Sequence, residues 1–116
     1  MTIRKEIIEE LMAEYKTPED LIGEAGLIKQ LSKALLERAL EGEMSHHLGY
    51  KKHQARPEGL DNSRNGTTKK KLTTRDGQLD IEAPRDREAT FDPQIVKKHQ
   101  RRFAGFDEKI ISMYAR

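Results

Sequence analysis

Residues 27–48 carry the longest helical pattern in this 116-residue chain, and they constrain its fold more than any other stretch. At 100° per residue, two sets of apolar side chains fall on two sides of the predicted helix. The first set spans an arc of about 120° and comprises Leu27, Ile28, Leu31, Leu35 and Ala39. The second comprises Leu36, Leu40, Met44 and Leu48. A helix that is apolar on two sides must bury both, so either two neighbouring elements pack on it or a second copy covers one side.

Two shorter helices are predicted before it. Apolar residues recur at helical spacing over residues 3–15, which indicates an amphipathic helix. The stretch "TPED" then has the features of a helix start, with Thr17 as the N-cap and Pro18 at the first helical position. Gly49 is placed to end the long helix as a C-cap glycine.

The middle of the chain is predicted to form a loop and a β-hairpin instead of helices. Residues 50–68 have no hydrophobic period and are expected to form a long loop. Residues 69–83 predict a β-hairpin around the two-residue turn Asp76-Gly77. The predicted register pairs Thr74 with Leu79, Leu72 with Ile81 and Lys70 with Ala83 on a mostly apolar face, and Thr73 with Asp80 and Lys71 with Glu82 on the other.

A basic helix is expected after the hairpin. Over residues 94–103 the cations Lys97, Lys98, Arg101 and Arg102 fall on one side, and Ile95, Val96, His99 and Phe103 on the other. Gly105 would break this helix and Asp107 would cap a further one, which is still in progress at Arg116 and suggests a truncated protein. The predicted class is α+β and mainly helical. Its parts are a helical segment at 1–49, a loop, hairpin and basic helix at 50–104, and the start of a further helix at 105–116.

Charge is segregated along the chain, although the formal net charge is only +2. Residues 1–50 carry 6 basic and 10 acidic side chains, and residues 76–94 carry 2 and 6. By contrast, residues 51–75 carry 8 basic and 2 acidic side chains, and residues 95–116 carry 6 and 2. Two basic blocks of this kind are typical of a surface that binds a polyanion.

Composition excludes several other classes of protein. With no cysteine, the chain has neither a disulfide framework nor a thiolate metal site. It has no apolar run near the roughly 18 residues that a membrane helix needs, and its N-terminus lacks a signal-peptide h-region. We therefore expect a cytoplasmic protein without a membrane partner.

The sequence gives only weak evidence for a catalytic or metal-binding site. The four histidines are badly spaced for a metal, since His46 and His47 would point apart on a helix. A two-metal nuclease site built from the carboxylates Asp76, Asp80, Glu82, Asp86 and Asp92 is conceivable. However, Asp76 fits a turn, Glu82 fits a cross-strand pair, and no P-loop or Ser/His/Asp spacing occurs. We expect no catalytic residue, metal site or cofactor in these 116 residues.

The stretch "NSRNG" (62–66) allows two interpretations. It can be a tight surface turn, because Asn and Gly tolerate left-handed backbone angles. It can also face nucleic acid, because Asn and Arg pair with base edges while neighbouring cations hold phosphates. The resulting DNA-binding candidates are Asn62, Arg64, Asn65, Lys69, Lys70, Lys71, Lys97, Lys98, Arg101 and Arg102. Lys and Arg are expected to hold phosphates, and Asn62, Arg64 or Asn65 to approach base edges.

Three stretches resemble the N-terminal region of bacterial insertion-sequence transposases of the Mutator type. They are "LLERALEGEMSHHLGYKKH", "NSRNG" and "IEAPRDREATFDPQIVKKHQRRFAGFDEKIISMYAR". The resemblance adds Arg85 and Arg87 of "PRDR" to the DNA-contacting candidates and implies a nucleoid-associated protein that binds the terminal inverted repeats of its element. It also implies that residues 105–116 begin a helix-turn-helix-like segment.

The resemblance further implies strand cleavage and transfer by an Asp/Asp/Glu triad that holds a divalent metal, expected to be Mg²⁺, in an RNase H-like domain. None of that triad matches a residue of this chain. Two other hypotheses stay open. The chain can be an interaction module in which the 27–48 helix dimerises, so that it assembles with full-length transposase or inhibits it. It can also be a small nuclease in its own right.

Overall fold

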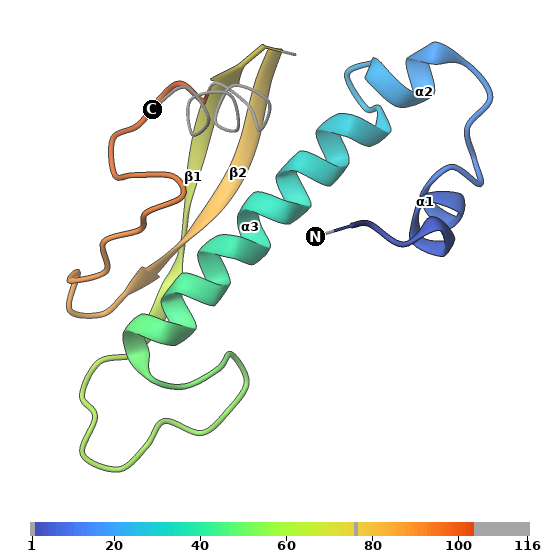
Figure 1. Cartoon of the computed structure of the whole chain (residues 1–116). Helices are drawn as coiled ribbons and strands as arrows, with labels where there is room; N and C mark the ends of the chain where they lie inside the picture. The colour runs from blue at the N-terminus through green and yellow to red at the C-terminus, as the bar shows by residue number, and fades with distance from the viewer. Residues whose placement is uncertain (1, 76, 104–116) are drawn as a thin grey trace, which may run out of the picture. The chain divides into compact units, whose positions relative to one another are not determined.

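The computed structural model describes residues 2–75 and 77–103 and has three helices followed by two strands (Figure 1). The helices are α1 (Lys5–Leu11), α2 (Pro18–Ile22) and α3 (Leu27–Leu48), and the strands are β1 (Arg64–Thr74) and β2 (Gly77–Asp86). This confirms the α+β class, but the chain is not mainly helical as predicted, because the three helices have only 7, 5 and 22 residues. The helix predicted from Asp107 and the helix-turn-helix-like segment at 105–116 lie outside the described residues, as does Asp76.

The chain divides into two compact units, residues 1–32 and 33–116. In the first unit, α1 is shorter than the predicted 3–15 helix, and none of its residues is buried. The start of α2 is as predicted, because the amides of Thr17 and Lys16 donate to the Asp20 carboxylate at 2.9 and 2.8 Å. These bonds lower the pKa of Asp20.

Helix α3 has the predicted bounds and ends at Gly49, whose φ of +87° is the left-handed conformation of a C-cap glycine. All four residues of its second apolar set are buried. Leu36 and Leu40 pack with Leu72, Leu79 and Ile81 of the hairpin in the main core. A smaller cluster joins Met44 and Leu48 to Phe91. Within the described part of the chain, no helix is long and apolar enough to span a membrane.

The hairpin presents the predicted face to α3, but the predicted register is wrong. Thr74 pairs with Gly77, and Leu72 pairs with Leu79, where the sequence predicted Ile81. Gly77 therefore begins β2 instead of sitting in the turn. The error is two residues, and because side chains alternate with a period of two, the same side chains still face the core.

The outer edges of this two-stranded sheet are occupied in part by other segments. On β1, the Thr73 amide donates to the Arg101 carbonyl at 2.8 Å, and the Thr73 carbonyl accepts from the Phe103 amide at 2.9 Å. On β2, the Glu82 amide donates to the Glu37 carboxylate of α3 at 2.7 Å. Hydrogen bonds to other segments thus hold both outer edges of the hairpin.

The stretch 62–66 is not a tight turn. Arg64 pairs with Asp86 and Thr67 with Pro84, so Asn65 and Gly66 together oppose one residue of β2. This is a β-bulge, and Gly66 supplies the left-handed residue with a φ of +70°. The predicted left-handed glycine is therefore present, but it bends a strand instead of reversing the chain.

Replacing Gly66 with alanine should lower the free energy of unfolding by about 1 kcal/mol, because a Cβ disfavours the left-handed conformation by roughly 1–2 kcal/mol. Urea denaturation measures this. Gly42→Ala is the matched control, since Gly42 lies in α3 and a Cβ there would meet no other atom within 4 Å. That control should be more stable than the parent chain by up to about 1 kcal/mol. Unchanged or increased stability of Gly66→Ala would contradict the bulge assignment.

The predicted helix over 94–103 is wrong, because this segment is irregular in the structure. Its backbone finds hydrogen-bond partners outside itself. The Glu43 carboxylate of α3 accepts from the amides of Gln94 (3.1 Å) and Ile95 (3.0 Å), and β1 pairs with the chain around Arg102. His99 has a φ of +65°, which a helix does not allow. Val96 and Phe103 are nevertheless buried in the main core, as their apolar spacing suggested.

Candidate nucleic-acid interface

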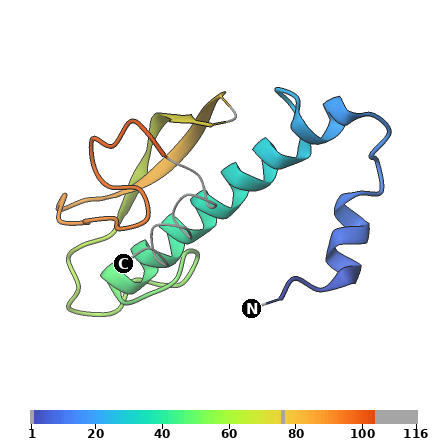
Figure 2. The same cartoon turned by 45° about the horizontal axis from the view of Figure 1, so that its top comes forward.

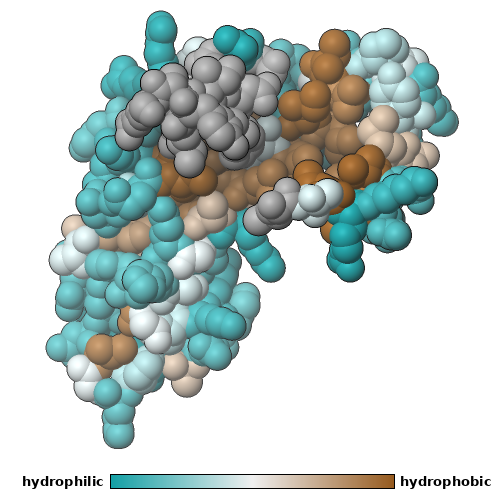
Figure 3. All heavy atoms as spheres, in the orientation of Figure 1, coloured by the Kyte–Doolittle hydropathy of each residue, from teal (hydrophilic) through white to brown (hydrophobic). Residues whose placement is uncertain are grey.

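A groove runs between the hairpin and the segment 87–101 that follows it. The described residues give it seven cationic side chains: Lys69, Lys70, Lys71, Arg85, Arg87, Lys98 and Arg101. Asp86 is the acidic residue among them, and it is buried. Where grey atoms do not cover it, the left side of the molecule in Figure 3 is largely hydrophilic. A strongly cationic groove of this kind attracts a polyanion.

The exposed face of the hairpin is cationic on β1 and acidic on β2. Cross-strand neighbours on this face are Lys69 with Glu82 and Lys71 with Asp80. A duplex centred on the ribbon would therefore meet carboxylates as well as lysines. Beside β1, its lysines instead line the groove together with Arg87, Lys98 and Arg101 of the 87–101 segment.

Asp86 ties together the end of β2 and the turn that follows it. Its carboxylate accepts from the Asn62 amide group at 2.8 Å, from the Thr90 hydroxyl at 2.9 Å, and from the backbone amides of Thr90 (3.0 Å) and Phe91 (3.2 Å). His47 Nε2 of α3 lies 3.3 Å from the same carboxylate and 3.0 Å from Thr90 Oγ1. The His47 ring also packs on Phe91, with 5.5 Å between ring centroids.

These bonds control the charge state of Asp86. Burial alone would raise the pKa of Asp86, because it removes the charged carboxylate from water. The hydrogen bonds from Asn62, Thr90 and Phe91 act in the opposite direction and hold the pKa of Asp86 well below its ordinary value. The carboxylate is therefore ionised at neutral pH and holds Asn62 to the turn at Thr90 and Phe91.

Arg64 faces the protein interior rather than the groove. Its Nε donates to Glu41 at 2.7 Å, and Nη2 donates to Ser45 Oγ at 2.8 Å and to the Tyr50 carbonyl at 3.2 Å. The guanidinium also lies over the Tyr50 ring, 5.3 Å from its centroid. Nη1 is buried without a hydrogen-bond partner among the described residues. Arg64 thus connects α3, the start of the loop and the start of β1.

Lys70 holds one wall of the groove. Its Nζ donates to the Lys97 carbonyl at 2.6 Å, so the 97–101 segment is fixed against β1. Partial burial lowers the pKa of Lys70. Two neighbours on the same strand, Lys69 and Lys71, are exposed and have no such bond among the described residues.

The structure brings most of the predicted DNA-binding residues together. Eight of them line the groove, namely Asn65, Lys69, Lys70, Lys71, Arg85, Arg87, Lys98 and Arg101. Lys97 is exposed on the 87–101 segment, and Arg102 is exposed directly after it. Asn62 and Arg64 instead have protein partners: Asn62 donates to Asp86 and accepts from the Glu88 amide at 3.1 Å. Asn62 and Arg64 therefore hold together elements next to the groove instead of lining it.

Sequence patterns did not reveal the roles of Asp86, His47 and Glu43. His47 and Glu43 bond to residues 39 or more positions away, and Asp86 bonds to Asn62 24 positions away as well as to the nearby Thr90 and Phe91. Local patterns do not reveal the long-range partners. The one available signal was the acidic residue inside the basic stretch "PRDR". Among the described residues, no three His, Asp or Glu side chains gather in a group that could hold a metal ion.

Comparisons with known proteins give consistent matches. The sequence matches the family model described as "Transposase, Mutator family" over residues 2–116. Over its whole length it is 43% identical to the transposase for insertion sequence element ISRM3 of Rhizobium meliloti (strain 1021), of which it covers 28%. It is 42% identical to the probable transposase for an ISRM3-like element of Sinorhizobium fredii, again covering 28% of that protein.

A more distant match is the transposase for insertion sequence element IS256 in transposon Tn4001 of Staphylococcus aureus. Identity there is 25% over 113 residues, which is 97% of this chain and 27% of that protein. The chain therefore spans less than a third of the length of these relatives.

Proposed function

Because this chain belongs to the Mutator family of transposases, we propose that it forms the part of such an enzyme that binds DNA at the ends of the mobile element. The observation that carries the proposal is the groove beside β1, with seven cations from two separate segments of the chain. Cations in such numbers neutralise several phosphates, and each contact adds affinity that depends on salt.

The proposed contacts divide by chemistry. Lys69, Lys71 and Arg87 are exposed at the groove and suit phosphates. Asn65 is the residue of "NSRNG" that lines the groove, so we assign base-edge contact to Asn65 rather than to Asn62 or Arg64. Arg64 and Asn62 support this site by holding the bulge and the turn behind it.

The dimensions of the site suit a DNA duplex. The residues of β1 that line the groove run from Asn65 to Thr73, and at about 3.3 Å per residue this stretch corresponds to about 26 Å. One turn of B-DNA is about 34–36 Å long. A duplex beside β1 would therefore present phosphates to the groove along most of one turn.

Strand cleavage and transfer are proposed to require residues that this chain does not contain, since it covers 28% of its relatives. We place the acidic triad and its divalent metal, expected to be Mg²⁺, there. The chain would supply recognition of the terminal inverted repeats.

The test is a comparison of two duplexes by fluorescence anisotropy. One carries the terminal inverted repeat of the element, and the other has the same base composition in scrambled order. We expect tighter binding to the inverted repeat, with log affinity falling linearly as log salt rises. Equal and weak binding to both duplexes, without dependence on salt, would refute the proposal.

Self-association is a second candidate function, favoured by the first apolar set of α3. Within this set, Leu35 is 50% exposed. A second copy, or full-length transposase, would cover this surface. Sedimentation at micromolar concentration tests it. A concentration-dependent dimer that Leu35→Gln dissociates is expected, and a strict monomer would refute it.

A further inference from the structure

We propose that the turn of residues 51–54 forms a second phosphate-contacting surface, which extends the proposed DNA site beyond the end of the groove. This inference rests on the proposed function, and it concerns Lys51 and Lys52, which do not line the groove. Four observations support it: the charge of the turn, its internal order, its connection to the groove, and the separation of its cations from the acidic part of the loop.

The turn is cationic and exposed. Residues 50–56 read "YKKHQAR" and contain no acidic residue. Every residue from 51 to 60 is exposed. Neither lysine side chain has an ion-pair or hydrogen-bond partner within the part of the chain that the structure describes. Two adjacent ammonium groups are thus available to an anion.

The turn is internally ordered. The Lys51 amide donates to Gln54 Oε1 at 2.9 Å, and the Gln54 amide donates to the Lys51 carbonyl at 3.1 Å. His53 closes the turn in the left-handed conformation, with a φ of +70°. Because these bonds already fix the backbone, binding a phosphate would require little further loss of conformational entropy.

Both ends of the loop are fastened to the structure that forms the groove. At its start, the Tyr50 carbonyl accepts a hydrogen bond from Arg64, the first residue of β1. At its end, the Ser63 carbonyl accepts from the amide of Arg87, which lines the groove. Figures 1 and 2 both show the loop at the end of the hairpin where β1 begins and β2 ends. A duplex that follows the groove would meet the turn next.

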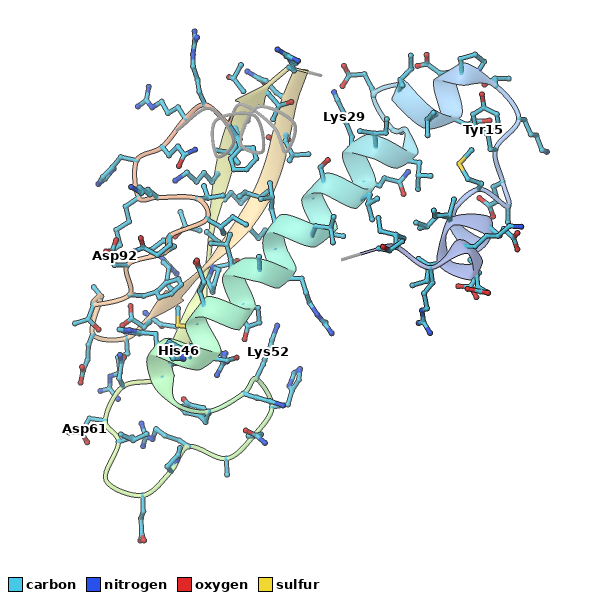
Figure 4. The ribbon with its side chains drawn as sticks, viewed as in Figure 1. Tyr15, Lys29, His46, Lys52, Asp61 and Asp92 are labelled. Carbon is cyan, nitrogen blue, oxygen red and sulfur yellow. The ribbon has the colours of Figure 1, made fainter. Side chains whose placement is uncertain are left out.

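The acidic residues of the loop do not neutralise the turn. Glu58 and Asp61 belong to the returning arm, and Figure 4 shows Asp61 and Lys52 on opposite sides of the loop. Arg56 links the arms through a 3.4 Å hydrogen bond to the Asp61 carbonyl. The two lysines lie just after the C-terminus of α3, where cations favour the helix dipole. That effect falls off within the last turn and does not require two adjacent exposed lysines.

The test uses the whole chain and an inverted-repeat duplex long enough to extend past the groove. K51Q/K52Q should reduce the slope of log affinity against log salt concentration by about 1.8, because each neutralised phosphate contributes about 0.9. Hydroxyl-radical footprinting should show protection shortened at one end only. K33Q/R38Q is the matched control, because it removes two exposed cations of α3 that do not line the groove. It should leave the slope and the footprint unchanged.

K69Q/K71Q separates this inference from the proposed function. If K69Q/K71Q reduces the slope while K51Q/K52Q leaves slope and footprint unchanged, the second surface is refuted and the groove stands. An equal loss in K33Q/R38Q also overturns the inference, because net charge alone would then explain it. If neither K69Q/K71Q nor K51Q/K52Q changes the slope, the proposed function itself fails. Circular dichroism checks that each variant is folded.

Discussion

Replacing Asp86 with alanine is expected to lower the free energy of unfolding by about 3 kcal/mol or more. The substitution removes a buried carboxylate that accepts four hydrogen bonds from Asn62, Thr90 and Phe91 and lies beside His47. The donors left behind are partly buried, and each unsatisfied donor costs about 1–3 kcal/mol. For a domain of this size, such a loss is a large fraction of total stability.

Urea denaturation at pH 7 measures this effect. Asp92→Ala is the matched control, since Asp92 is an exposed aspartate a few residues further along the same segment. It should change the free energy of unfolding by less than about 0.5 kcal/mol. A similar small change in Asp86→Ala would show that the hydrogen bonds around Asp86 do not stabilise the fold.

The same residue predicts how stability depends on pH. The pKa of Asp86 is depressed in the folded protein relative to the unfolded chain, where it is about 3.9. Its stabilising contribution is therefore fully present above about pH 5. As pH falls below about 4, the unfolded chain takes up the proton first, and stability declines until the folded carboxyl is also protonated. Asp86→Asn should remove this part of the acid dependence.

Neutralising four cations of the groove should have the largest effect on DNA binding. In K69Q/K71Q/R85Q/R87Q, the salt slope is expected to fall by about 3.6, since each neutralised phosphate contributes about 0.9. All four residues line the groove and are exposed, so little change in stability is expected. Titration of a labelled duplex at several salt concentrations gives the slope directly.

The appropriate control neutralises the same number of charges elsewhere. R4Q/K16Q/K33Q/R38Q removes four exposed cations that do not line the groove. This variant should keep a slope close to that of the parent chain. If both variants lose affinity and slope equally, the groove is not the DNA site, and binding reflects only overall charge.

The bounds of α3 and the start of α2 could be predicted from the sequence because their signals are local. The two apolar sets and Gly49 define the bounds of α3, and Thr17 and Pro18 define the start of α2. The register of the hairpin was mispredicted by two residues, since alternation fixes which face is buried but not which residues pair. The 94–103 segment was mispredicted because its amides bond to Glu43 and to β1, which no local pattern reveals.

The same distinction between local signals and long-range partners applies to the candidate site. Clustered lysines and arginines in the sequence indicated the cations that line the groove. The sequence did not indicate that Arg64 and Asn62 turn inward, because their partners Glu41 and Asp86 are more than 20 positions away. The charge pattern thus indicates which cations such a surface carries, while tertiary hydrogen bonds decide which polar residues reach it.

The bonds along the hairpin edges have a consequence for solubility. A two-stranded ribbon is marginally stable alone, and its unpaired edges can recruit strands from other chains into aggregates. Here Thr73 on one edge is already bonded to Arg101 and Phe103, and Glu82 on the other edge is bonded to Glu37. These contacts shield the ribbon against intermolecular strand pairing while leaving the side chains of Lys69 and Lys71 exposed to a ligand.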